Sequence, residues 1–332
     1  MIVDKPLAEL KQYRPSLTQQ ADFDSFWEQT VAESNRQPLN ATLEEISYPA
    51  RQVRVYRLQF DGFGSGTRVN AWYMVPTESS LADNAGKRPA IVHYHGYSGS
   101  KGRPTSYLHW ALQGYNVLAV DTRGQDGDTP DNHLYPQGSA VGFMTRGIND
   151  PLHYFYRFAY MDCLRAVNFL RTQPEIGPVA VTGGSQGGGL TLAVAALGAD
   201  QQLVAAMADV PAAMADVPYL CHFQRAVEVF STGPYQELVN HWKTYPGAVE
   251  NNFRTLSYFD GMNFASRIRC PVLLSVGLLD TTCPPSTGFA VYNHLEVEKD
   301  IKIYPFNGHE GGSTWHEEEK YRFLSKHLGL EG

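Results

Sequence analysis

Residues 177–198 decide the expected fold of this chain, and they read Gly-Pro-Val-Ala-Val-Thr-Gly-Gly-Ser-Gln-Gly-Gly-Gly-Leu-Thr-Leu-Ala-Val-Ala-Ala-Leu-Gly. Residues 177–182 are apolar and β-branched, which predicts a strand, whereas residues 190–198 are rich in Ala and Leu and end in Gly, which predicts a helix. Between them lies the only G-x-S-x-G pattern of the chain, Gly183-Gly184-Ser185-Gln186-Gly187, typical of a serine on a tight turn. The alternative is an ordinary Gly-rich turn, but the flanking segments favour Ser185 as a nucleophile.

Short apolar runs recur on both sides of this turn. Residues 52–60 and 69–75 alternate in polarity around a Gly-rich connection, which predicts an antiparallel hairpin. Further apolar runs predict strands at 90–95, 115–120, 203–208, 271–276 and 301–306. Helical spacing predicts helices at 21–34, 107–112, 150–170 and 314–327, the third capped by Asp150 with Pro151 in its first turn.

The alternation of strands and helices predicts an α/β fold with a mostly parallel central sheet and helices on both faces. An antiparallel N-terminal hairpin, then crossovers, then a serine turn is the order of the α/β-hydrolase fold. We expect a single domain over residues 1–332, with an N-terminal helical extension over about 1–45. A helical, aromatic-rich insertion is expected over about 218–266, near the active site. A near repeat, Met207–Pro218, precedes it and has no functional interpretation.

The composition is that of a globular protein, with 332 residues, 43% of them hydrophobic and 18% charged. A net charge of −7 without a basic run gives no reason to expect nucleic acid or a membrane surface as a partner. The chain shows no membrane-spanning stretch and no signal-peptide core, so we expect a cytoplasmic location. The cysteines lack C-x-x-C spacing and are expected to be reduced thiols: Cys163, Cys221, Cys270 and Cys283.

A nucleophilic serine needs a base within hydrogen-bond reach, and the base needs an orienting carboxylate. In this fold the chain order is serine, acid, histidine. Asp280 comes shortly after the predicted strand 271–276, whereas Asp300 lies at the far end of the sheet. The order therefore favours Asp280 as the acid, although a helix cap is an alternative for this residue on its own.

His309 is the expected base because it directly follows the last predicted strand in a Gly-rich loop. Three other histidines downstream of Asp280 fall in predicted helices and are expected at the surface: His294, His316 and His327. The ordered set Ser185, Asp280 and His309 is much more specific than any one of its members.

Acyl transfer also requires donors aimed at the developing oxyanion. The backbone N–H of Gln186 is one expected donor, because it lies at a helix N-terminus, where negative charge is favoured. The loop His95-Gly96-Tyr97-Ser98-Gly99 is expected to supply the second donor, the N–H of Tyr97.

His93 and His95 raise a competing interpretation as metal ligands, because alternate residues of a strand share a face. Neither a carboxylate nor a third histidine accompanies them, and His-Gly is a usual opening of this loop. We therefore expect no metal and no other cofactor.

Three motifs together resemble those of the acetyl xylan esterase and cephalosporin C deacetylase family, the seventh family of carbohydrate esterases. They are Asp121-Thr122-Arg123-Gly124-Gln125, Gly183-Gly184-Ser185-Gln186-Gly187 and Gly308-His309-Glu310, and the resemblance covers nearly the whole chain. It implies a triad of Ser185, Asp280 and His309 and an oxyanion hole formed by Tyr97 and Gln186. It also implies that Arg123, Gly124 and Gln125 brace loops beside the elbow. From the residues alone, these three indicate only a polar turn after a strand.

The resemblance implies a serine esterase that removes acetyl groups from small carbohydrates, such as acetylated xylo-oligosaccharides, and from cephalosporin C-like acetates. A general short-chain carboxylesterase is an alternative. An α/β-hydrolase peptidase normally carries an extra N-terminal domain, for which this chain leaves no room, and a non-catalytic ligand-binding member is expected to have lost a triad residue. The resemblance further implies a homohexamer, a trimer of dimers. Aromatic residues of the N-terminus and the insertion look exposed and suited to subunit contacts.

Overall fold

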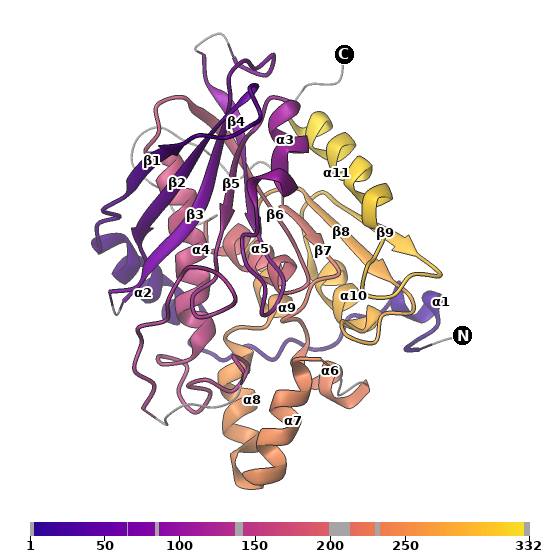
Figure 1. The fold of residues 1–332 in the computed structure, drawn as a ribbon. Helices are drawn as coiled ribbons and strands as arrows, with labels where there is room; N and C mark the ends of the chain where they lie inside the picture. The colour runs from indigo at the N-terminus through magenta and orange to yellow at the C-terminus, as the bar shows by residue number, and fades with distance from the viewer. Residues whose placement is uncertain are drawn as a thin grey trace.

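A central β-sheet with helices on both faces forms the body of the protein (Figure 1). The computed structural model describes residues 3–64, 66–83, 86–136, 142–198, 213–229 and 233–328. Within these ranges the sheet has nine strands in the order β1-β2-β3-β5-β4-β6-β7-β8-β9. The strands are β1 (Thr42–Ile46), β2 (Val53–Asp61), β3 (Arg68–Pro76), β4 (Arg88–Tyr94), β5 (Asn116–Val120), β6 (Ile176–Gly184), β7 (Ala213–Asp216), β8 (Val272–Gly277) and β9 (Lys299–Tyr304).

Strands β1, β2 and β3 are antiparallel to their neighbours, and the remaining six strands, β4 to β9, run parallel to one another. This confirms the predicted α/β fold, with a mostly parallel sheet and an N-terminal hairpin of β2 and β3. The hairpin is extended by β1, which was not predicted. Four of the five β1 residues are exposed, so the strand lacks the alternation that marks a half-buried strand.

The α-helices are α1 (Leu7–Leu10), α2 (Phe23–Arg36), α3 (Leu108–Leu112), α4 (Phe155–Arg171), α5 (Gln186–Leu197), α6 (Phe223–Val229), α7 (Tyr235–Thr244), α8 (Val249–Ser257), α9 (Gly261–Phe264), α10 (Pro285–His294) and α11 (Ser313–His327). One face of the sheet packs on α2, α4, α5, α9 and α10, and the other packs on α3 and α11. None of the helices within the described ranges is both long and apolar enough to cross a bilayer.

Helix α4 begins at Phe155, so the prediction that Asp150 caps it and Pro151 starts it was wrong. Asp150 instead begins a separate turn, in which its carboxylate accepts the backbone N–H of Leu152 at 2.9 Å and its carbonyl accepts that of His153 at 3.0 Å. Tyr154 then adopts an extended conformation (φ −71°, ψ 136°), which separates this turn from the helix.

The strand predicted at 203–208 and the first half of the near repeat Met207–Pro218, residues 207–212, lie outside the described residues. The second copy of the repeated residues, from Met214, contributes to β7, which lies between β6 and β8. This copy therefore forms the strand next to the serine turn.

The N-terminal segment crosses the molecule from α1, near α10, to α2, as Figure 1 shows. Its aromatic residues Phe23 and Trp27 are buried and pack on Phe264, and in the insertion Tyr219 and Tyr235 are buried too. The expectation that the aromatic residues of these segments are exposed was therefore wrong for these four. Each segment covers the other's apolar surface, and sequence patterns do not reveal such partners. Tyr245 is an exception and is 59% exposed.

Candidate active site

Ser185 lies at the junction of β6 and α5 with a strained backbone, at φ 56° and ψ −120°. The strand β7 and the loop that follows it hold this turn in place. The Ser185 N–H donates to the carbonyl of Asp216 at 2.9 Å, and the Ser185 carbonyl accepts the N–H of Tyr219 at 2.9 Å. A Cβ atom at Gly183 or Gly187 would overlap the backbone around Tyr94, which explains why the turn needs glycine at both positions.

The structure brings Ser185, His309 and Asp280 into one hydrogen-bonded series. The Oγ of Ser185 lies 3.0 Å from Nε2 of His309, and Nδ1 of His309 lies 2.9 Å from Oδ2 of Asp280. His309 lies in the loop between β9 and α11, and Asp280 lies between β8 and α10. The backbone N–H groups of Thr282 and Cys283 donate to Oδ1 of Asp280, which leaves Oδ2 for the imidazole. This arrangement orients the ring with Nε2 toward the serine.

His316, which was expected at the surface, is buried, so that expectation was wrong. Its Nε2 lies 2.8 Å from Oδ1 of Asp216, and Lys320 donates to Oδ2 of the same carboxylate at 3.0 Å. Burial raises the pKa of Asp216, but Lys320 and His316 outweigh this and lower the pKa to about 2. His294 is buried as well, with Nδ1 at 2.7 Å from the carbonyl of Ala290.

Neither of the backbone N–H groups predicted to bind the oxyanion, those of Tyr97 and Gln186, has an acceptor within the described part of the chain. Gln186 is the first residue of α5, and Tyr97 follows Gly96, whose Cα approaches Ser185 so closely that an added Cβ would lie 3.9 Å from the serine Cβ. The Tyr97 hydroxyl donates to Glu237 of α7 at 2.7 Å. The insertion thus anchors the loop that carries one of the two predicted oxyanion donors.

His93 and His95 contact different partners. The Nε2 of His95 accepts the N–H of Thr122 at 2.9 Å, and its Nδ1 donates to the carbonyl of Gly96 at 2.8 Å. The His93 ring packs on Tyr107, and desolvation lowers its pKa to about 4. In His95 both ring nitrogens are therefore used to hold the loop after β4.

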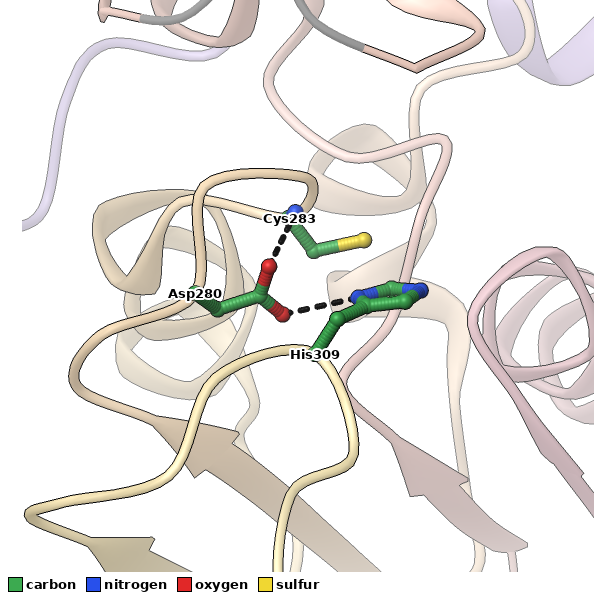
Figure 2. Close-up of side chains that lie close together, drawn as sticks. All are labelled: Asp280, Cys283 and His309. Carbon is green, nitrogen blue, oxygen red and sulfur yellow. Dashed lines mark hydrogen bonds and ion pairs between the residues drawn. The ribbon is translucent and has the colours of Figure 1, made fainter.

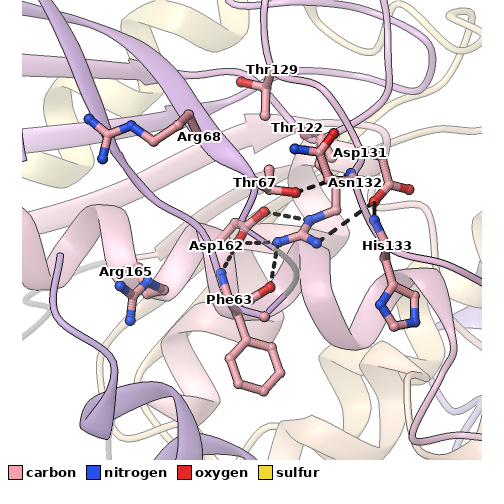
Figure 3. A network of polar contacts seen from close by, with 12 residues as sticks. Phe63, Thr67, Arg68, Thr122, Thr129, Asp131, Asn132, His133, Asp162 and Arg165 are labelled. Atoms are coloured by element: carbon pink, nitrogen blue, oxygen red, sulfur yellow. Dashed lines mark hydrogen bonds and ion pairs between the residues drawn. The ribbon is translucent and has the colours of Figure 1, made fainter. Parts of the chain in front are cut away.

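Arg123 joins three segments beside the elbow. Its guanidinium donates to both carboxylate oxygens of Asp162 in α4 at 2.7 Å and to the carbonyl of Phe63 at 2.8 Å. Figure 3 shows Phe63, Asp131 and Asp162 close together in this polar network. Burial lowers the pKa of Arg123, but the ion pair with Asp162 outweighs it and leaves the pKa raised. Gly124 has φ +66°, and an added Cβ would lie 2.8 Å from the Cβ of Asp131.

Gln125 pairs with Gln186 through two amide hydrogen bonds. Nε2 of Gln125 donates to Oε1 of Gln186 at 2.8 Å, and Nε2 of Gln186 donates back at 3.1 Å. The hydroxyl of Tyr156 also donates to Oε1 of Gln186 at 3.0 Å. The side chain of Gln186 is thereby held in place by both Gln125 and Tyr156.

Arg123→Ala is expected to lower the free energy of unfolding by about 3–5 kcal/mol, because Asp162 would remain buried without its cation. Urea unfolding followed by fluorescence measures this change. Arg57→Ala is the matched control, since Arg57 pairs with Glu44 at the exposed surface and its loss is expected to change stability little. Equal unfolding midpoints for the two variants would contradict the stabilising role of the buried pair.

Three residues of the site were not predicted from the sequence: Glu237, Tyr219 and Cys283. Glu237 and Tyr219 contact the site across the fold, and no motif marks them. Cys283 lies three residues after Asp280, and its buried thiol lies within 4.8 Å of a carboxylate oxygen of Asp280 and a ring nitrogen of His309. The signal for Cys283 was its nearness in sequence to Asp280, whereas the prediction for the cysteines was only that they are reduced thiols. All four cysteines are free and buried.

Comparisons with known proteins agree with these features. The profile described as "Acetyl xylan esterase (AXE1)" matches residues 1–327. The structure of an acetyl xylan esterase from Paenibacillus sp. R4 is 44% identical, covers 97% of this chain and 99% of its own, and superimposes with a TM-score of 0.90. That of acetyl xylan esterase 1 from Thermoanaerobacterium sp. JW/SL YS485 is 32% identical, covers 99% and 100%, and has a TM-score of 0.88.

A curated relative, acetyl esterase Axe7A of Xylanibacter ruminicola, is 28% identical over 311 residues. The match includes 89% of this chain but spans 65% of the length of that relative. The resemblance that the three motifs indicated is confirmed by the match along the chain and by the two solved structures. The chain belongs to the acetyl xylan esterase family, with an α/β-hydrolase fold.

Proposed function

We propose that this protein is a serine esterase that hydrolyses acetyl esters of small carbohydrates, with Ser185 as the nucleophile. The observation that carries the proposal is the series Ser185–His309–Asp280, with contacts of 3.0 Å and 2.9 Å at the N-terminus of α5. Family membership supports an ester hydrolase, and the names of the two solved relatives support acetylated xylan fragments as substrates.

In this mechanism His309 takes the proton of Ser185 as its Oγ attacks the acetyl carbonyl carbon. The negative charge that develops on the carbonyl oxygen is stabilised by the N–H groups of Tyr97 and Gln186. His309 then gives the proton to the leaving alcohol oxygen, which releases the sugar and leaves an acetyl-enzyme. Water, deprotonated by His309, then attacks the acetyl carbon, and His309 returns the proton to Oγ of Ser185 as acetate leaves, while Asp280 orients the imidazole throughout. Arg123, Gly124 and Gln125 act as loop-bracing residues, and the sequence of steps uses no cofactor.

The part of the active site that holds the acyl group is expected to accept acetyl and to reject longer acyl groups. The groups next to the elbow are densely packed: the N–H of Tyr219 donates to the carbonyl of Ser185 at 2.9 Å, the buried ring of Tyr219 lies 6.2 Å from that of Tyr97, and the buried thiol of Cys283 lies within 4.8 Å of a ring nitrogen of His309. Enlarging so dense a site costs about 1–3 kcal/mol, because neighbouring side chains must leave favourable rotamers. We expect kcat/KM for p-nitrophenyl esters to fall roughly ten- to two-hundred-fold beyond propionate. A maximum at octanoate would contradict the assignment as a deacetylase and favour a general carboxylesterase.

Cephalosporin C-like acetates are a second proposed substrate class. The part of the active site that holds the alcohol portion of the ester is expected to open toward solvent and so to accept unrelated alcohols. Acetate release from acetylated xylo-oligosaccharides and from cephalosporin C tests this point. Acetate release from xylo-oligosaccharides only would restrict the proposal to carbohydrate esters. A cytoplasmic location also stays a prediction, supported by four free cysteines.

A homohexamer built from dimers is the proposed assembly, on the basis of family membership. Such an assembly would exclude polymeric xylan from the active sites, so short acetylated oligosaccharides are expected to react much faster than the polymer. Light scattering at micromolar concentration measures the number of chains. A monomer, or equal rates on polymer and oligomer, would contradict the hexamer.

A further inference from the structure

Three side chains with metal-ligating atoms meet beside Ser185: Asp280, Cys283 and His309 (Figure 2). A carboxylate oxygen, the thiol sulfur and an imidazole nitrogen all lie within 4.8 Å of one another. Within the ranges that the structure describes, this is the one such group of three. We propose that this cluster is an inhibitory site for a thiophilic divalent cation such as Zn²⁺. The inhibition rests on the proposed esterase function, whereas the binding does not.

The donor set matches the ligand preferences of zinc. Thiolate, imidazole and carboxylate are the side-chain ligands of protein zinc sites, and water completes a tetrahedral set. Two ligands on a tetrahedral zinc ion lie roughly 3.5 Å apart, so small side-chain rotations bring the three atoms to bonding distance. Mg²⁺ prefers oxygen ligands in an octahedral set and does not suit a site with a sulfur donor.

The cluster combines one partly exposed ligand with two buried ones. The side chain of His309 is 36% exposed, while Asp280 is fully buried. Two backbone N–H groups bond Oδ1 of Asp280, so Oδ2 is the oxygen that faces the histidine and the cation. One of these N–H groups belongs to Cys283, which ties the thiol-bearing residue to the carboxylate. The protein therefore holds two of the three ligands together before any metal binds.

Cation binding removes the base of the proposed mechanism. The thiol of Cys283 releases one proton to solvent as the sulfur–metal bond forms. If Nε2 of His309 binds the metal, its lone pair can no longer take the Ser185 proton. If Nδ1 binds, it gives up its hydrogen bond to Asp280, and the ring proton resides on Nε2, with the same consequence. Whichever ring nitrogen of His309 binds the metal, Ser185 is left without an acceptor for its proton.

Inhibition of p-nitrophenyl acetate hydrolysis by buffered Zn²⁺ tests the site, with each variant compared with its own rate in EDTA. Wild type is expected to be inhibited by Zn²⁺, restored by EDTA and unaffected by Mg²⁺. Cys283→Ser is expected to need at least about tenfold more Zn²⁺ for half-inhibition, because even outer partners of metal ligands contribute that much to affinity. Cys270→Ser is the matched control, since Cys270 is buried outside the cluster, and it should behave as wild type.

Equal Zn²⁺ sensitivity of wild type and Cys283→Ser, or an uninhibited wild type, would overturn the proposal. Cys283→Ala is the second variant, and circular dichroism verifies that each variant is folded.

Metal binding is also measured without turnover, through the ultraviolet charge-transfer absorption of a thiolate bound to Cd²⁺. Wild type and Ser185→Ala are expected to show this band, and Cys283→Ser is expected to lack it. A band in Cys283→Ser, or no band in wild type, would refute the metal site whatever the esterase activity. Conversely, an active Ser185→Ala protein with the band would refute the proposed function and leave the metal site standing.

Discussion

Ser185→Ala is expected to lower kcat for acetyl ester hydrolysis by about a million-fold, the loss seen when the nucleophile of a serine hydrolase is removed. The reason is that no other hydroxyl is held 3.0 Å from Nε2 of His309 in the described structure. Removing Oγ leaves the backbone contacts of the elbow with Asp216 and Tyr219 in place, so the fold is expected to persist. Stopped assays with p-nitrophenyl acetate measure the change.

Ser257→Ala serves as the matched control for this variant. Ser257 is a buried serine of α8 that hydrogen-bonds with Gln20 and the carbonyl of Arg254, and it is not part of the proposed mechanism. Its kcat is expected to stay near the wild-type value. A purified, folded Ser185→Ala protein with near-normal activity would remove Ser185 from the mechanism.

Asp280→Asn is expected to lower kcat by about ten-thousand-fold, by analogy with the same change in serine proteases. The amide oxygen of asparagine can still accept the N–H groups of Thr282 and Cys283, which turns its NH₂ group toward His309. The ring must then accept at Nδ1 and carry its proton on Nε2, so it cannot take the proton of Ser185. Steady-state kinetics measure the loss, and the thermal unfolding midpoint reports whether the protein stays folded.

Asp300→Asn is the control for the acid. Asp300 lies in β9 and pairs with Lys302 at the surface, and its substitution is expected to leave kcat unchanged. If Asp280→Asn retained most of the wild-type kcat, the orienting role of Asp280 would be wrong.

The sequence was sufficient to predict the fold class, the hairpin of β2 and β3 and the family, because these depend on local patterns. Alternating polarity marks β2 and β3, and the turn at Ser185 joins a strand to a helix within a few residues. The dependence on local patterns also explains why the predicted start of α4 was wrong. Asp150-Pro151 resembles a helix start but begins a separate turn that ends before α4.

Contacts between distant segments could not be predicted in this way. Tyr97 and Glu237 are 140 positions apart, and their hydrogen bond forms because α7 lies against the loop after β4. His316 is buried because Asp216, 100 positions earlier, lies beside it at the end of β7. Local patterns carry no information about such partners, so burial and pairing of polar groups had to come from the structure.

The most direct test of the central claim is covalent labelling of the nucleophile with diethyl p-nitrophenyl phosphate. This reagent forms a phosphoester with an activated serine and loses p-nitrophenolate, and peptide mass spectrometry locates the adduct. We predict one diethylphosphoryl group on Ser185, loss of activity in proportion to labelling, and no label in Ser185→Ala or in protein whose His309 is replaced by alanine. Label on another residue such as Cys283, or full activity after complete labelling of Ser185, would contradict the account.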